Sequence, residues 1–186
     1  MVRDVAQPVS GIATGRFYKR TYRSFGEFFS DQVFLIKNLR QVRRIMGENL
    51  IPGGFRERLM LAVVSVYGCR YCSWRHTREA LRCGVDNDEI AGLLIGSVDN
   101  CPQDEAVALL YAQHWADSDT HPDPEACARL EEAYGAEKAQ AINLILRMIR
   151  VGNLSGNTWD RFLYRLPFGR RVVALGKFGS SRGMDL

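Results

Sequence analysis

The stretch "IPGGFRERLMLAVVSVYGCRYCSWRHTREALRCG", residues 51–84, decides the fold and also contains two cysteines and a histidine close together. Its proline and two glycines at 51–54 mark a break in the chain. The apolar segment 55–67 that follows is too short to span a membrane and is typical of a buried helix. Gly68 should loosen that helix, and a second helix is expected over 69–84, which ends on a plausible C′ glycine. The stretch therefore predicts two helices joined by a bend.

The rest of the chain shows the same helical periodicity and no strand alternation. Apolar residues recur at steps of three and four over 25–46, which predicts one amphipathic helix. The later segments are bounded by helix-capping residues and glycines. Helices are expected from Asp86, over 101–117, from Asp123, and over 136–164 with an interruption at "VGNLSGN" (151–157). The pattern predicts an all-α fold.

The chain divides into a core and two peripheral ends. The helical core is expected over 51–166, and a helical extension should precede it over 1–50. Residues 167–186 are rich in glycine and arginine and have little to bury, which indicates an extended or disordered tail.

The net charge of +4 is unevenly distributed. Residues 1–58 carry 11 Lys and Arg against 5 Asp and Glu, residues 59–146 carry 6 against 14, and residues 147–186 carry 8 against 2. The basic ends and the acidic middle can complement each other within or between subunits, or the ends can dock an acidic partner. No zinc-finger spacing, aromatic RNA-binding motif or lysine-rich run indicates a nucleic-acid partner.

Composition points to a cytoplasmic protein. No apolar run approaches the ~18–20 residues of a membrane-spanning helix, and "MVRDVAQPVSGIATG" (1–15) lacks the apolar region of a secretory signal. Five cysteines at irregular spacing argue against a secreted disulfide framework. In a reducing compartment a close cysteine pair is typically catalytic or metal-binding.

Cys69, Cys72 and His76 lie on one face of the expected helix. At about 100° per residue their directions fall within a sector of roughly 60°. The start of a helix favours a thiolate at Cys69, and His76 is placed to accept a proton from Cys72. Glu57, twelve residues before Cys69, could orient His76 if the chain bends at Gly68. The aromatic residues Tyr71 and Trp74 flank the site, either as walls of a substrate pocket or as core residues.

The pattern Glu57, Cys69–Arg–Tyr–Cys72, His76 resembles the AhpD-like alkylhydroperoxidases of the carboxymuconolactone decarboxylase superfamily. The resemblance covers residues 51–94 and, more weakly, the helical stretch to about 165. It implies an all-helical, oligomeric protein, a trimer or hexamer, with thiol-dependent peroxidase (antioxidant) activity and no metal or organic cofactor. The best-known members carry a second histidine where this chain has Tyr71, which leaves the proton route through that position open.

By the same resemblance, Cys72 would attack the peroxide and become a sulfenic acid. Cys69 would donate a proton and then form a redox-active disulfide with Cys72, while His76 and Glu57 relay protons. A dithiol reductant protein, thioredoxin-like or lipoyl-bearing, would restore the pair.

Four alternatives stay open. The cysteines could be small apolar residues of a buried face, or two ligands of a zinc site with His76 and an unidentified fourth group. The chain could also be a carboxymuconolactone decarboxylase-like enzyme, although those members typically lack the cysteine pair. A non-enzymatic zinc-binding or interaction protein is the fourth.

Overall fold

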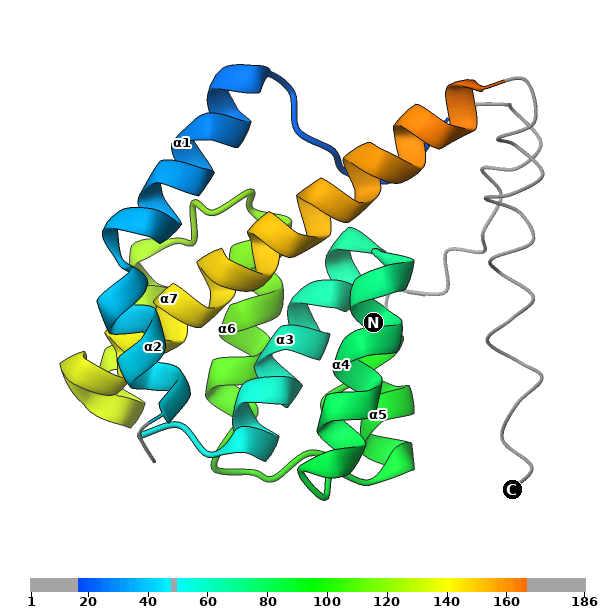
Figure 1. Ribbon diagram of the computed structural model, residues 1–186. Helices are drawn as coiled ribbons and strands as arrows, with labels where there is room; N and C mark the ends of the chain where they lie inside the picture. Colours follow the sequence, from blue (N-terminus) through cyan, green and yellow to red (C-terminus); the bar gives the residue numbers. More distant parts are fainter. Residues whose placement is uncertain (1–16, 48–49, 167–186) are drawn as a thin grey trace.

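The computed structural model describes residues 17–47 and 50–166 (Figure 1). In these ranges the chain forms seven helices and no strand, which confirms the predicted all-α fold. The predicted tail over 167–186 and the first part of the predicted extension lie outside the described residues. The helices are α1 (Phe25–Lys37), α2 (Leu39–Gly47), α3 (Gly53–Tyr67), α4 (Arg70–Arg82), α5 (Asn87–Leu94), α6 (Ala106–Asp117) and α7 (Pro124–Arg165).

Helix α3 is the centre of the core. It packs against α4, α5, α6 and α7, and Figure 1 shows it running between α4 and α6. Leu59, Leu61, Ala62 and Val63 have no exposed surface. A helix that is apolar nearly all round is stable in water only when its neighbours cover it on every side. The predicted buried helix over 55–67 is therefore confirmed.

Several predicted helix ends are present. Asp123 caps α7, because its carboxylate accepts the N–H of Ala126 at 2.8 Å, and Pro124 occupies the first helical position. Asp86 caps α5 by accepting the N–H of Asp88 at 2.8 Å. These side chains satisfy N–H groups that have no partner within the helix.

Three helix boundaries differ from the prediction. The single helix expected over 25–46 is two helices separated at Asn38, whose backbone (φ −99°, ψ 11°) leaves the helical region. Helix α6 begins only at Ala106, because turns occupy the preceding residues. The break in the last helix lies at Gly135 (φ 75°, ψ 159°), and residues 151–157, where the interruption was expected, are helical throughout.

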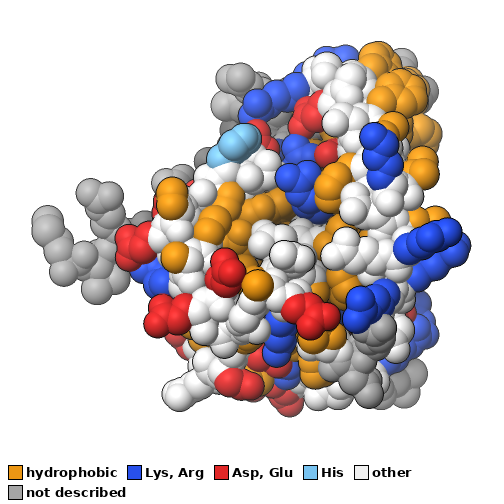
Figure 2. Space-filling model, turned by 90° about the vertical axis from the view of Figure 1, so that its left-hand side faces the viewer, with side chains coloured by type: hydrophobic (Ala, Val, Ile, Leu, Met, Phe, Trp, Pro, Cys, Tyr) orange, Lys and Arg blue, Asp and Glu red, His pale blue; other side chains and the backbone are white. Residues whose placement is uncertain are grey.

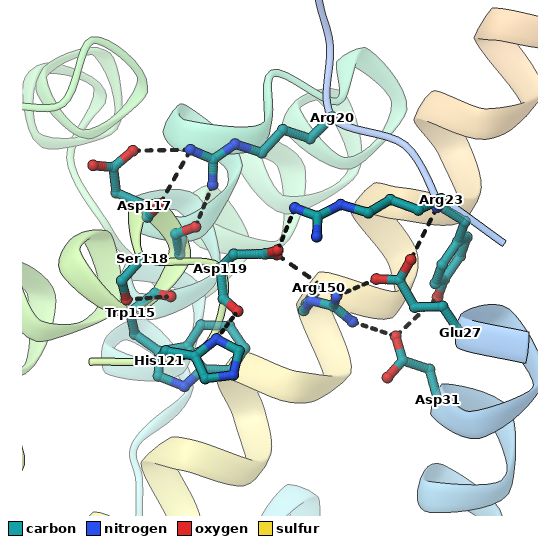
Figure 3. A network of polar contacts seen from close by, with 12 residues as sticks. Arg20, Arg23, Glu27, Asp31, Trp115, Asp117, Ser118, Asp119, His121 and Arg150 are labelled. Carbon is teal, nitrogen blue, oxygen red and sulfur yellow. Dashed lines mark hydrogen bonds and ion pairs between the residues drawn. The ribbon is translucent and has the colours of Figure 1, made fainter. Parts of the chain in front are cut away.

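The segment before α1, residues 17–24, joins distant parts of the chain, and we call it the N-terminal strap. Arg20 donates to the carbonyl of Ala116 at 2.6 Å and to the Asp117 carboxylate at 2.9 Å. Arg23 pairs with Asp119 at 2.7 Å (Figure 3). Basic residues of the N-terminal part thus meet acidic residues of the middle part within one chain, as one of the two readings of the charge distribution predicted.

Helix α1 presents apolar side chains to solvent. Phe25, Phe29 and Ile36 are 84%, 61% and 70% exposed, and hydrophobic side chains reach the surface on the face that includes α1 and α2 (Figure 2). Its polar residues face inward, where the buried Arg150 of α7 pairs with Glu27 at 2.7 Å and with Asp31 (Figure 3). Within the described ranges, no helix combines the length and the apolar character needed to cross a bilayer.

Candidate active site

Gly68 forms the joint between α3 and α4. It has left-handed backbone angles (φ 66°, ψ 30°), which glycine adopts without steric cost, and its N–H closes α3 on the carbonyl of Val64 at 2.8 Å. Cys69 then becomes the N-cap of α4, with its backbone extended. The predicted bend is confirmed, and it turns α4 back against α3.

The two thiols of the motif lie side by side in the interior. Cys69 and Cys72 are 1% and 4% exposed, and their Sγ atoms are 2.9 Å apart. This separation exceeds the roughly 2.05 Å of an S–S bond, so both cysteines are free thiols in this structure. Both side chains already face each other, and little movement is needed to join them.

The start of α4 stabilises negative charge on Cys69. Its Sγ is hydrogen-bonded to the Cys72 Sγ at 2.9 Å and accepts the Cys72 N–H at 3.3 Å. The thiol hydrogen bond is the largest cause that lowers the pKa of Cys69 to about 7, against the opposing effect of burial. The same hydrogen bond, together with burial and the neighbouring Cys69, raises the pKa of Cys72. The thiolate therefore forms more readily on Cys69 than on Cys72.

Helix α7 closes the site over the thiols through two glycines. A Cβ atom at Gly156 would lie 2.8 Å from the Cys69 Sγ, closer than side chains approach, whereas one at Gly152 would lie 3.8 Å from the Cys72 Sγ. The α7 backbone can approach Cys69 this closely only because residue 156 is glycine. These glycines, expected to interrupt the helix, instead give it a surface that fits the cysteine pair.

Polar residues of α7 hold the joint and the strap together. Asn157 is fully buried, and its Nδ2 donates to the carbonyl of Tyr67 at 2.8 Å and to that of Arg20 at 3.0 Å. Asp160 pairs with Lys19 and with Arg70, each at 3.1 Å. Sequence reasoning missed Asn157, Asp160 and Lys19.

One signal in the sequence could have found the α7 face. The dipeptide Gly–Asn occurs at 152–153 and again at 156–157, four residues apart. That spacing places both dipeptides on one face of a helix. It therefore favours a continuous helix that packs through this face over an interruption of the helix.

His76 and Glu57 form a second pair between α4 and α3. The Nδ1 of His76 is 2.7 Å from the Oε2 of Glu57, and the two side chains are 12% and 5% exposed. Because a carboxylate only accepts, Nδ1 carries the hydrogen and Nε2 is left as a base. The contact expected from the bend at Gly68 is thus present. Among the described residues, however, no hydrogen bond joins His76 to either cysteine.

The two aromatic candidates lie on the outer face of α4. Tyr71 and Trp74 are 59% and 56% exposed, with ring centroids 6.1 Å apart. The guanidinium of Arg78 lies over the Trp74 ring, 5.0 Å from its centroid. They are therefore surface residues beside the thiols and are not part of the core.

The geometry bears on the zinc alternative. Within residues 17–47 and 50–166, no three His, Cys, Asp or Glu side chains converge in a way that could hold a metal ion. His76 is engaged by Glu57, and the nearest group to each thiol is the other thiol. The described residues thus offer a zinc ion no third and fourth ligand beside the cysteine pair.

Comparison with known proteins places the site within a family. Residues 38–113 match the model of the carboxymuconolactone decarboxylase family. This segment is similar to that family, and the match covers less than half of the chain. The matched range runs from α2 into α6 and contains Glu57, Cys69, Cys72 and His76, so the resemblance noted in the sequence is confirmed at the level of the superfamily. No curated protein and no solved structure matches the chain significantly.

Proposed function

We propose that the protein is a thiol-dependent peroxidase. The observation that carries the proposal is the pair of buried, free thiols 2.9 Å apart at the start of α4, one of them with its pKa lowered to about 7. A thiolate beside a second thiol is the arrangement that two-electron thiol oxidation requires. The similarity of residues 38–113 to an enzyme family supports a catalytic role for the site.

In the first step the proton of Cys72 passes to the Cys69 thiolate, and the Cys72 thiolate attacks the terminal oxygen of the hydroperoxide. The sulfur supplies an electron pair, the O–O bond breaks, and Cys72 becomes a sulfenic acid. The alkoxide that leaves takes the proton from Cys69 and departs as an alcohol. The assignment of Cys72 as the attacking residue follows the family resemblance, and the 2.9 Å contact between the two sulfurs provides the route by which its proton would pass to Cys69.

In the second step the regenerated Cys69 thiolate attacks the sulfur of the Cys72 sulfenic acid. An S–S bond forms, and the hydroxide that leaves is protonated to water. The Nε2 of His76, with Glu57 holding the Nδ1–H, would take up the Cys69 proton when the thiolate first forms and would return that proton to the hydroxide in this step. Both transfers would pass through a water molecule, because no hydrogen bond joins the two pairs directly among the described residues. Two thiols and one peroxide thus become a disulfide, an alcohol and water.

The direct test is a thiol count on the reduced protein with and without an organic hydroperoxide. We expect two thiols to be lost per chain and a peptide containing a Cys69–Cys72 disulfide to appear in the mass spectrum. Survival of both thiols at a peroxide excess would refute the proposal.

The family name supports a second candidate, a decarboxylase or lactone-handling enzyme. The Cys69→Ser/Cys72→Ser double variant separates the two candidates. Peroxide reduction should vanish in this variant, whereas decarboxylation of a carboxymuconolactone-type substrate, if it occurs, should persist.

The proposal includes a dithiol reductant, thioredoxin-like or lipoyl-bearing, that reopens the disulfide in the cytoplasm. It also includes a homo-oligomer, a trimer or hexamer. The exposed apolar side chains Phe25, Phe29 and Ile36 of α1 support self-association, because patches of this kind are usually covered in assemblies. Light scattering after size-exclusion chromatography would measure the oligomer directly.

A further inference from the structure

We infer that the N-terminal strap is part of the thiol site and that Lys19 is a positioning residue whose buried ammonium group stabilises the Cys69 thiolate. The inference rests on the proposed function and extends it to a segment outside the matched family range, which begins at residue 38. It assigns the strap a role in reactivity in addition to its structural contacts.

Lys19 is a buried cation in a small charge cluster. Its side chain is 7% exposed, and its Nζ lies 3.1 Å from the Oδ2 of Asp160, whose side chain is 6% exposed. Arg70 takes the other carboxylate oxygen of Asp160, with its Nε at 3.2 Å and its NH2 group at 3.1 Å. Two cations thus share one carboxylate, which leaves a net positive charge at this place.

Independent contacts place this cluster beside Cys69. Arg70 directly follows Cys69 in the chain, and Asp160 lies one helical turn beyond Gly156, which packs on the Cys69 Sγ. On the strap, the carbonyl of Arg20, the residue after Lys19, accepts the Asn157 hydrogen bond. The strap is therefore held against the part of α7 that packs on the Cys69 Sγ, and Asp160 connects it to the start of α4 through Arg70.

The charges that act on Cys69 come from each element around it. The Lys19 ammonium lowers the pKa of Cys69, and the Asp160 carboxylate raises it. Cys72 contributes its two hydrogen bonds from α4. Because these groups are buried, their interactions are weakly screened by solvent and salt. Opposite charges in such a site move a pKa by about one to three, so Lys19 and Asp160 should each have a measurable effect.

The test compares Lys19→Met with Asp160→Asn in the full chain. The readout is the ultraviolet thiolate absorbance as a function of pH, and each variant is measured against the same variant carrying Cys69→Ser. Lys19→Met should raise the pKa of Cys69 by about 1, which lowers the thiolate fraction at pH ~7 about fivefold. Asp160→Asn should lower the pKa, because it removes the negative charge. Lys19→Arg should restore the wild-type titration.

Arg23→Met is the matched control, since Arg23 is a strap cation that pairs with Asp119 at 2.7 Å and is itself 80% exposed (Figure 3). It should leave the Cys69 titration unchanged. If the substitutions merely loosened the strap, the pKa of Cys69 would shift in the same direction in Lys19→Met, Asp160→Asn and Arg23→Met, and that result would overturn the inference. An unchanged pKa of Cys69 in Lys19→Met would also overturn it. Failure of the proposed function is separate, because it would show as wild-type thiols that survive peroxide.

Discussion

The thiol pair and the His76–Glu57 pair both use α4, but the molecule builds them in different ways. The histidine pair needs only the antiparallel packing of α3 and α4 and keeps some access to solvent, with His76 12% exposed. The thiol pair is covered by a third helix, where Gly156 lies against Cys69, and the strap is held to that helix by the ion pair of Lys19 with Asp160.

This difference separates two requirements of the proposed chemistry. A proton relay must exchange protons with water, and a pair near the surface can do so. A reactive thiolate needs fixed hydrogen bonds and a shield from unwanted oxidation, which burial against α7 supplies. Substitutions in the histidine pair should therefore change the rate of peroxide consumption without changing the thiolate absorbance of Cys69, whereas substitutions around the thiol pair should change that absorbance.

The largest effect is expected from the thiol pair itself. Cys72→Ser should lower peroxide consumption by at least about a thousandfold, because it removes the proposed nucleophile. Cys69→Ser should instead leave a sulfenic acid on Cys72 that a dimedone-type reagent traps. Cys83→Ser, at an exposed cysteine outside the site, is the control and should retain full activity. A sulfenic acid trapped at Cys69 in the Cys72→Ser variant would exchange the roles of the two cysteines.

A smaller effect is expected from the histidine pair. Glu57→Gln keeps the size of the side chain but no longer provides a carboxylate to hold the Nδ1–H of His76. Peroxide consumption should fall about a hundredfold, while the thiolate absorbance of Cys69 should stay as in the wild type. Glu79→Gln, which disturbs only the surface pair with Arg82 at 2.7 Å, is the control. A parallel loss of the thiolate would contradict the separation of the two pairs.

The close packing of α7 on the thiols should contribute to the free energy of unfolding. Gly156→Ala would place a Cβ 2.8 Å from the Cys69 Sγ, and we expect the free energy of unfolding to fall by about 2 kcal/mol. Gly152→Ala, whose Cβ would lie at an ordinary 3.8 Å from the Cys72 Sγ, should be neutral or up to about 1 kcal/mol more stable, since alanine favours a helix interior. Denaturant unfolding measures both variants, and equal effects would show that the α7 approach is not tight.

The smallest effect is the pH dependence of Cys69. A cation and hydrogen bonds that favour the thiolate lower the pKa, so the thiolate should already form at a midpoint of about 7 and not near the usual value of about 8.5. The Cys69 thiolate fraction should therefore rise about tenfold between pH ~6 and pH ~8. The wild-type minus Cys69→Ser difference in ultraviolet absorbance measures this transition. A midpoint near the usual value would show that the surroundings of the thiol pair do not stabilise the Cys69 thiolate.

Much of this arrangement was predictable from local pattern. The bend at Gly68, the shared helix face of Cys69, Cys72 and His76, and the approach of Glu57 all follow from spacing, because they involve two consecutive helices joined by one glycine. The capping residues Asp86 and Asp123 were predictable for the same reason, since a cap depends on residues within one turn.

The contributions of distant segments were not predictable in this way. The periodicity of 25–46 identified an amphipathic pattern, but the orientation of α1 depends on Arg150, which holds Glu27 and Asp31 from α7. Gly156 would read equally well as a helix breaker until the position of Cys69 is known. The place of Lys19 beside the thiol site follows only from its ion pair with Asp160, which lies far along the chain.

The sequence by itself determined the helices, the joint at Gly68 and the four residues of the motif, because these depend on neighbours along the chain. Only the tertiary structure decided that α7 and the N-terminal strap complete the thiol site. The contact of α7 with Cys69 and the contacts of the strap with α7 arise from packing between segments that are remote in sequence, and such contacts cannot be inferred from local spacing.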